Sequence, residues 1–193
     1  MQAHCFVTGT ALKLESGLEY DLLLMLERDP SAAWFVPQPT RLGVQLPNGR
    51  RTVHTPDLLM LDAAGHVTIW NVRSAERQDE KFRIQSDATA AACREVGWGY
   101  DVFAGHSRAR KYNLRWLAAY RHVRPWYEAA RPELVGLCDT GATMNDVIEA
   151  DRGSGHLVSA MWHYAWRGDL VVDLDHWIDR RAPIAWTHGG SDG

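Results

Sequence analysis

Hydrophobic and polar residues recur with two different periods along the N-terminal half of the chain, and these periods predict both helices and strands. The pair Ser16 and Glu19 has the spacing of a helix capping box, and the apolar run after it predicts a helix over residues 16–28. A second helix is expected over residues 76–96, where apolar residues recur at helical spacing before Gly97. Short apolar or β-branched runs predict the strands: residues 34–36, 41–46, 51–54, 58–61, 67–72 and 100–104, with another around 5–8.

The order of these elements predicts an α/β fold, in which hairpin-connected strands and a helical crossover form a mixed sheet flanked by helices. A further helix is expected over residues 113–121, and beyond Pro125 the pattern is mainly helical. We therefore expect a core domain over residues 1–124 and a small C-terminal domain over residues 125–193. The latter combines three helices with a hairpin, as a winged-helix module does. Its expected elements are helices at 132–137, 143–149 and 155–166 and strands at 169–174 and 182–186, followed by a disordered tail at 189–193.

The polar residues within residues 52–76 point to a catalytic centre. Asp57 opens the first of two adjacent strands, which are joined by a turn at residues 62–65. Asn71 and Arg73 end the second strand, and because they are two positions apart their side chains share one face of the sheet. A carboxylate beside an amide and a base is the layout of a metal-dependent nuclease, in which carboxylates hold magnesium against a phosphodiester.

Glu19 is a candidate for a second carboxylate of this centre. At helical spacing it lies among Leu22, Leu23 and Leu26 on the inward face, whereas Asp21 lies on the opposite side. A carboxylate on an inward face is costly unless it is paired or bound to a metal. The alternative is that Glu19 only caps its own helix, and both roles are compatible.

Composition narrows the class of protein. An apolar fraction of 46% is sufficient for a globular core, and neither a signal peptide nor a membrane-spanning run is apparent, so we expect a cytoplasmic protein with no membrane partner. Cys5, Cys93 and Cys138 are widely separated, which predicts reduced, buried thiols rather than a zinc site. His122 and His163 are expected to be ordinary surface or core residues.

Charge gives a weaker signal. The net charge is −3, yet residues 102–127 contain no acidic residue and interleave basic with aromatic side chains. Such a segment either follows a DNA backbone or forms a solvated helix packed through its aromatic residues, and the sequence favours neither reading. Because phosphate neutralisation supplies most non-specific affinity, the low net charge favours a partner that delivers the DNA. The candidate DNA contacts are Arg108, Arg110, Lys111 and Arg115.

These features occur within a set of motifs that resembles one family. The set resembles the TnsA-type endonuclease subunit of heteromeric transposases, which belongs to the restriction-endonuclease-like PD-(D/E)xK superfamily. The resemblance covers residues 12–124 well and the C-terminal part in outline. It rests on Ser16-Gly17-Leu18-Glu19, Glu27-Arg28-Asp29-Pro30, Gln38-Pro39, Thr55-Pro56-Asp57 with the strands after it, and the segment from Asn113 to Arg121.

The resemblance implies a function and a partner. It implies a magnesium-dependent endonuclease, with manganese as a possible substitute, that cuts one DNA strand at transposon ends while a DDE-type transposase cuts the other. An ATP-dependent regulator commonly joins the pair. By position, Glu19 and Asp57 match the acidic metal ligands, Asn71 replaces Glu, Asp or Gln, Arg73 replaces Lys, and Val72 lends its backbone carbonyl to the metal.

Two departures from the family pattern leave alternatives open. Asn71 offers an uncharged, shorter ligand, and Arg73 is a permanent cation that binds phosphate but is no base near neutral pH. Glu76 or Glu80 is a candidate for the missing acid. The alternatives are a catalytically decayed subunit for DNA binding or transposase assembly, and a stand-alone restriction or repair nuclease.

The helix expected over residues 155–166 leaves a further alternative open. As a recognition helix it offers His156, Ser159, His163 and Arg167, a poorly basic face. Docking of a protein is therefore as well supported as reading of DNA.

Overall fold

The computed structural model describes residues 1–187 and forms two compact units, Met1–Gly105 and His106–Gly193. The division falls after Gly105, earlier than the boundary expected after residue 124. The reason is that helix α3 (Arg108–Leu117) packs on helix α6 (His156–Arg167), with the Trp116 and Trp162 rings edge to face at 6.1 Å. The tail expected at 189–193 lies outside the described residues.

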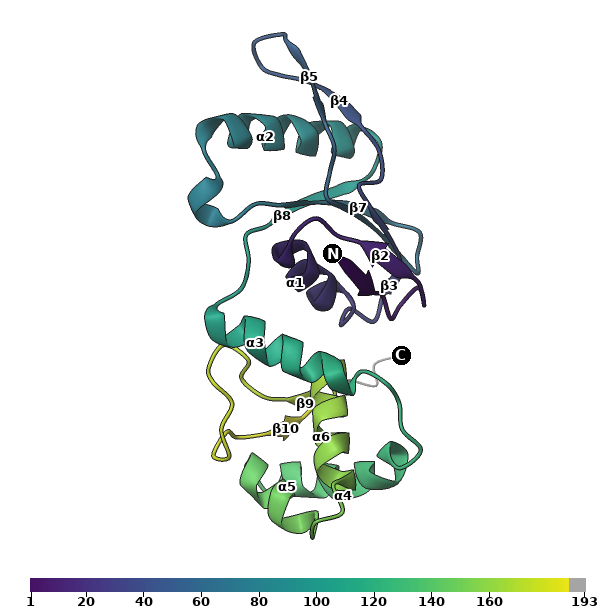
Figure 1. The fold of residues 1–193 in the computed structure, drawn as a ribbon, viewed down its shortest axis with the longest axis vertical. Coiled ribbons are helices and arrows are strands. Elements are labelled where there is room, and N and C mark those ends of the chain that lie inside the picture. Colours follow the sequence, from purple (N-terminus) through teal and green to yellow (C-terminus); the bar gives the residue numbers. More distant parts are fainter. Residues whose placement is uncertain (188–193) are drawn as a thin grey trace. The chain divides into compact units, whose positions relative to one another are not determined.

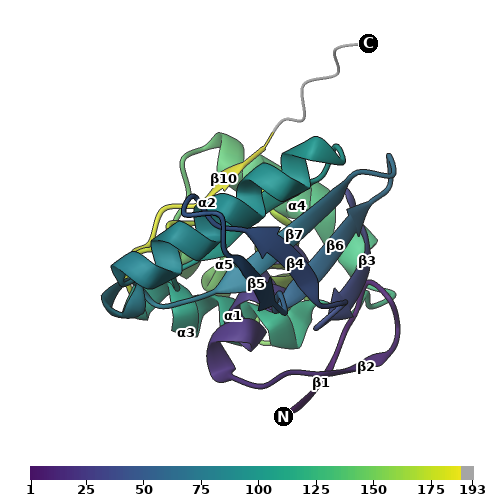
Figure 2. The same ribbon diagram turned by 90° about the horizontal axis from the view of Figure 1, so that it is seen from above.

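A mixed four-stranded sheet forms the centre of the first unit, as the sequence predicts. Its order is β3-β6-β7-β8, and Figure 2 shows β3, β6 and β7 side by side. The first three strands are antiparallel neighbours, whereas β8 runs parallel to β7 because helix α2 connects them as a crossover. The strands are β3 (Ala32–Pro37), β6 (Leu58–Asp62), β7 (Val67–Val72) and β8 (Gly99–Phe103).

Two helices cover opposite faces of this sheet (Figure 1). Helix α1 (Gly17–Leu26) begins at Ser16, whose hydroxyl oxygen accepts the Glu19 N–H at 3.1 Å, so the predicted cap is confirmed. Helix α2 (Glu80–Glu95) begins later than expected, after the 3-10 turn η1 (Ala75–Arg77). The delay arises because the Asp79 carboxylate caps α2 by accepting the Phe82 N–H at 2.8 Å.

The core of this unit lies between α1, the sheet and an N-terminal hairpin, β1 (Gln2–His4) with β2 (Ala11–Lys13). The expected strand around residues 5–8 is wrong. Those residues turn back between β1 and β2, and the Cys5 N–H donates to the Thr10 carbonyl at 2.8 Å. Asp21 was expected to face outward, yet it is buried. The core residues include Leu14, Leu22, Leu23, Leu26, Phe35, Leu58, Met60 and Phe103.

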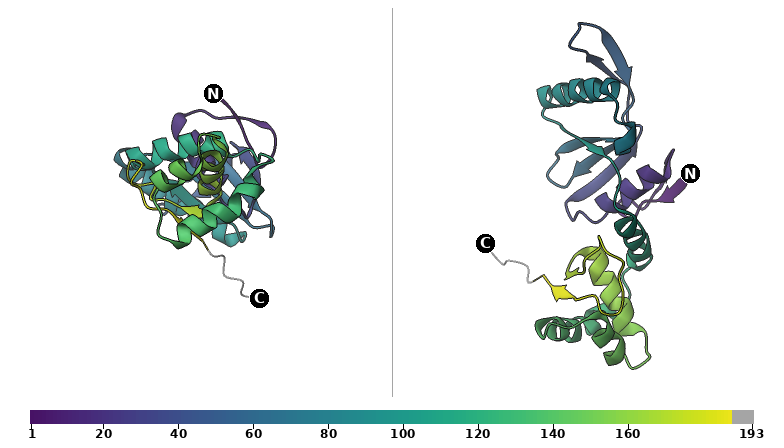
Figure 3. Two further views of the ribbon diagram at one scale, coloured as in Figure 1. Left: turned by 90° about the horizontal axis from the view of Figure 1, so that it is seen from below. Right: turned by 90° about the vertical axis from the view of Figure 1, so that its left-hand side faces the viewer.

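A separate hairpin, β4 (Leu42–Gln45) with β5 (Arg51–His54), extends past α2 (Figures 1 and 3). It turns at Asn48-Gly49 as predicted, and Gly49 has a φ of 77°, which favours glycine. Val44 is buried where β4 packs on α2. The hairpin ends at His54, three residues before Asp57, and so leads directly into the candidate site.

The second unit is mainly helical, with α6 packed against α3, α4 and α5 and against the short β9–β10 pair. Helix α4 contains Pro132 instead of starting there, because the Tyr127 ring at its start stacks on His163 with ring centroids 4.4 Å apart. Helix α3 starts at Arg108, earlier than the expected 113, since Ser107 caps it. The remaining elements are η2 (Ala118–Tyr120), α4 (Tyr127–Asp139), α5 (Met144–Ala150), β9 (Leu170–Val171) and β10 (Ala185–Trp186).

Two further expectations concern residue environments. Cys5, Cys93 and Cys138 are all buried and outside any disulfide, as predicted. Within residues 1–187, every helix is too short or too polar to cross a bilayer.

Candidate functional site

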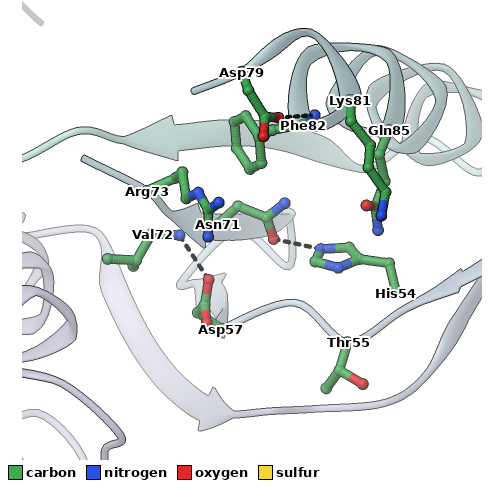
Figure 4. Close-up of a pocket in the computed structure, with 10 residues that line it drawn as sticks. All are labelled: His54, Thr55, Asp57, Asn71, Val72, Arg73, Asp79, Lys81, Phe82 and Gln85. Atoms are coloured by element: carbon green, nitrogen blue, oxygen red, sulfur yellow. Dashed lines mark hydrogen bonds between the residues drawn. The ribbon is translucent and has the colours of Figure 1, made fainter. Parts of the chain in front are cut away.

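A polar pocket of about 380 Å³ lies where β7 ends, below the start of α2 (Figure 4). It brings together Asp57, Asn71 and Arg73, which the sequence analysis assigned to one centre. Side chains from β5, β7 and α2 converge on it. The lining residues are His54, Thr55, Asp57, Asn71, Val72, Arg73, Asp79, Lys81, Phe82 and Gln85.

Hydrogen bonds hold Asp57 at the edge of the sheet, and one of them is donated by the Gln38 N–H to the Asp57 carbonyl at 3.0 Å. The Asp57 backbone N–H donates to the Trp70 carbonyl at 3.1 Å, and its Oδ2 accepts the Val72 N–H at 2.7 Å. Burial raises the pKa of the Asp57 carboxyl above its usual range; the Val72 N–H opposes that shift, and the nearby Glu19 carboxylate adds to it. The ionised form of Asp57 is therefore disfavoured by its surroundings.

Glu19 reaches Asp57 electrostatically while it also caps its own helix. Its Oε2 accepts the Glu15 N–H and its Oε1 accepts the Ser16 hydroxyl, both at 2.9 Å. The side chain is buried and raises the pKa of Asp57, so the two carboxyl groups lie within reach of each other's charge. Glu19 is not among the residues that line the pocket. Glu19 therefore caps its helix and also acts electrostatically on Asp57, so the two roles expected from the sequence are compatible.

Asn71 is buried and occupies the middle of a hydrogen-bond chain. Its Oδ1 lies 2.7 Å from His54 Nε2, and its amide group donates to the Tyr100 hydroxyl at 2.8 Å. The Tyr100 hydroxyl lies 2.8 Å from Ser86 Oγ on α2. Burial raises the pKa of Tyr100, against the effect of these two hydrogen bonds, so Tyr100 stays protonated at neutral pH. Both ends of the Asn71 amide are thus engaged within the fold.

Alternation along β7 places the candidate residues on different faces. Trp70 and Val72 pack on the core that contains α1, whereas Asn71 is bonded to Tyr100 and through it to α2. Glu19 belongs to α1, so it approaches from the face opposite Asn71. Asp57 lies at the strand end, where it interacts with both faces: it shares the pocket with Asn71 and Arg73 and shares charge with Glu19.

Arg73 is fixed beside the pocket. Its Nε donates to the Arg77 carbonyl at 2.9 Å, and its guanidinium lies 5.7 Å from the centre of the Phe82 ring. Gln78 Nε2 in turn donates to the Arg73 carbonyl at 2.9 Å. This geometry leaves a permanent cation at the rim, suited to binding a phosphate oxygen.

The sequence analysis missed His54 and Lys81, which both line the pocket (Figure 4). His54 stands just before Thr55-Pro56-Asp57, and its ring Nε2 lies 2.7 Å from Asn71 Oδ1. Lys81 enters from the first turn of α2, and reading Asp79 as that helix's cap would have placed it near the strand ends. The acids suggested earlier, Glu76 and Glu80, are not among the lining residues.

In the second unit, the candidate DNA contacts all lie on α3. Arg108 is exposed, and Arg110 forms an ion pair with Asp175 at 2.9 Å. Lys111 and Arg115 lie on the same helix. The four cations therefore lie on one helix, which is compatible with both readings of this segment, and their contact with DNA stays a prediction.

Helix α6, the candidate recognition helix, forms the interior of its unit. Its buried His163 donates a hydrogen bond from Nδ1–H to the Tyr120 carbonyl at 2.7 Å. The His156 ring stacks on Trp126 at 4.7 Å, and Ser159 accepts the Trp126 indole N–H at 3.0 Å. The polar side chains of α6 are thus engaged inside the unit. Helix α3, by contrast, carries the exposed Tyr112 and Trp116.

The expected magnesium site has few carboxylate ligands. Within residues 1–187, no three or more His, Cys, Asp or Glu side chains form a group that could hold a metal ion. The predicted magnesium ligands are Glu19, Asp57, Asn71 and the Val72 backbone carbonyl. This set has only two carboxyl groups and so is not a group of that kind, and its binding of magnesium stays a prediction. No family model matches the sequence, and no curated protein matches it either.

Proposed function

We propose that the chain is a metal-dependent DNA endonuclease subunit of a heteromeric transposase, which hydrolyses one strand at transposon ends. The observation that carries this proposal is Asp57: a half-buried carboxyl group in a polar pocket, whose ionised form is disfavoured by burial and by the charge of Glu19. Perturbed ionisable groups in pockets are typical of active sites. The transposase context and its partners, a DDE-type transposase and an ATP-dependent regulator, rest on the sequence resemblance alone.

The strand arrangement supports a restriction-endonuclease-like core. Such a core needs an acid where one strand begins and an amide or acid with a base where the next strand ends. Asp57 directly precedes β6, and Asn71 and Arg73 lie at the end of β7, which is antiparallel to β6. The helices of the second unit and its β9–β10 pair are compatible with a winged-helix-like module.

The residues at the pocket fit a divalent cation such as magnesium or manganese. Asp57 and Glu19 are carboxyl groups within electrostatic reach of each other, and a divalent cation held by Asp57 would offset their repulsion. When bound, such an ion offsets charge on a phosphate and lowers the pKa of a bound water. Within the chain, Arg73 is placed to bind phosphate, and His54 and Lys81 are placed to take up or release a proton at the pocket.

Nicking of DNA tests the proposal. The full chain is incubated with its transposase partner, transposon-end DNA and magnesium or manganese, with EDTA as the metal-free control. We expect single-strand nicks that depend on the metal and disappear in Asp57→Ala. Metal-dependent nicking that survives Asp57→Ala unchanged assigns the activity to another site.

A second candidate function is a catalytically decayed subunit that binds DNA or assembles the transposase. It is favoured by Asn71, whose amide oxygen and nitrogen are both hydrogen-bonded within the fold, and by Arg73, which cannot act as a base. The double variant Asn71→Glu with Arg73→Lys restores the usual side chains. Nicking that appears only in this variant identifies a decayed centre, whereas nicking by the unaltered chain excludes it.

A further inference from the structure

The second unit carries three large aromatic side chains that remain exposed at its surface. The relative exposures of Tyr112, Trp116 and Trp177 are 49%, 55% and 61%. Leaving rings of this size in water is unfavourable, and clustered exposure of this kind marks a binding surface.

Ring contacts and helical spacing place these side chains in a row along α3. Tyr112 stacks on Trp177, with centroids 5.8 Å apart and planes inclined by 30°. Trp116 follows Tyr112 by one helical turn on α3, so it lies on the same face of that helix. Trp116 also contacts Trp162 edge to face at 6.1 Å, which anchors the row on α6. We call Trp177, Tyr112, Trp116 and Trp162 the aromatic row.

The charges around the aromatic row are positive on the helix that carries it. Helix α3 contains Arg108, Arg110, Lys111 and Arg115 and no acidic residue. Arg108 precedes Tyr112 by one turn and so shares its face. The acids of the neighbouring loop are engaged locally: Asp175 pairs with Arg110 at 2.9 Å, and Asp173 pairs with His176 at 2.6 Å.

We propose that the aromatic row binds single-stranded DNA, with bases stacked on its rings and phosphates held by the cations of α3. The charge complementarity favours a polyanion, and the exposed ring faces favour unpaired bases, because paired bases cannot present their faces to a side chain. This inference goes beyond the proposed endonuclease function and does not depend on cleavage. The second unit would then bind the ends or the unpaired segments of DNA strands.

Binding of a fluorescently labelled, mixed-sequence single-stranded oligonucleotide to the full chain tests this proposal, with anisotropy measured in EDTA so that no cleavage occurs. We expect Trp116→Ala and Trp177→Ala each to weaken binding by about 10-fold, as loss of a stacked base contact does. Trp116→Phe, which keeps a ring, retains most of the affinity. Trp34→Ala is the matched control, since Trp34 is equally exposed in the first unit at 49% and leaves binding unchanged.

Several outcomes overturn the proposal. Equal affinity of the Trp116→Ala and Trp34→Ala variants shows that the row does not stack bases. An equal loss with fully paired DNA assigns the row to duplex binding instead. Unchanged single-strand binding together with lost transposase association makes the row a protein-docking surface. Because binding is measured in EDTA, where no cleavage occurs, failure of the nuclease proposal and failure of this one are distinguishable, and thermal melting of each variant confirms folding.

Discussion

The Asp57 pocket and the aromatic row each contain an energetically unfavourable feature, but of opposite kinds. One is a charge removed from water, and the other is apolar surface left in water. In the pocket, burial and the neighbouring Glu19 disfavour the ionised carboxylate of Asp57. In the row, Tyr112, Trp116 and Trp177 remain in water although their rings are apolar. Under the two proposals, a bound divalent cation would relieve the first cost and a stacked base would relieve the second. The comparison teaches that ligand-binding regions are found where the isolated fold is least well satisfied.

The largest expected effect is the loss of nicking in Asp57→Ala, which tests whether the Asp57 pocket acts independently of the aromatic row. Asp57→Ala should reduce metal-dependent nicking at least about 100-fold, because charge stabilisation by a bound metal is worth several kcal/mol. Binding of single-stranded DNA should stay unchanged in the same variant. Initial nicking rates and anisotropy titrations measure the two quantities. If both fall together, the regions are coupled and the comparison fails.

Glu19 tests whether the pocket needs its second carboxyl group. Glu19→Gln removes the charge and keeps an oxygen for the cap, so we expect manganese affinity to fall by about 10-fold or more, the scale of lost ligand-sphere support. Ser16→Ala is the matched control, since it weakens the same helix start by about 1 kcal/mol and removes one hydrogen bond to Glu19 but keeps the Glu19 carboxyl group. Isothermal titration with manganese compares them. Equal manganese affinity in Glu19→Gln and the unaltered chain restricts Glu19 to its capping role.

The raised pKa of Asp57 makes a prediction about stability and pH. A carboxyl group whose folded pKa is raised destabilises the fold in its ionised form; this cost is fully present above the folded pKa and fades as pH falls toward the unfolded pKa. Asp57→Asn should therefore melt higher than the unaltered chain at pH 8 in EDTA, with a gap that narrows toward pH 4.

Manganese should reverse that order of stability. At about 100 times the dissociation constant, bound metal stabilises the unaltered chain by about 2.7 kcal/mol, and Asp57→Asn gains little. Thermal melts across pH with and without manganese test both statements. A higher melting temperature for the unaltered chain in EDTA at pH 8 contradicts the assigned cost of ionised Asp57.

The smallest expected effect concerns the hydrogen-bond chain behind Asn71. Tyr100→Phe removes the hydroxyl between Asn71 and Ser86 and leaves both with one partner fewer, which should lower the free energy of unfolding by about 1–2 kcal/mol. Chemical denaturation measures the loss. Ser86→Ala removes only the outer partner and should cost less. If Tyr100→Phe is as stable as the unaltered protein, these hydrogen bonds contribute nothing to the free energy of unfolding.

Most secondary structure was predictable because its signals are local. The α1 cap depends on Ser16 and Glu19, three residues apart, and the turn of the β4–β5 hairpin depends on Asn48-Gly49. Errors arose where packing overrode those signals. Tyr127, stacked on His163, extends α4 upstream of Pro132, and the contact of Trp116 with Trp162 assigns α3 to the second unit.

The sequence by itself determined that Asp57 opens one strand, that Asn71 and Arg73 end the next, and that α3 mixes aromatic and basic residues. The tertiary structure decided that Asn71 is hydrogen-bonded by His54 and Tyr100, which lie 17 and 29 positions away from it in the sequence. It likewise decided that Glu19, from the helix on the other face of the sheet, affects the charge of Asp57. It also decided that Trp177, 65 positions from Tyr112, completes the aromatic row. Residue spacing fixes contacts within a helical turn or a hairpin, whereas contacts at these separations depend on how whole elements pack.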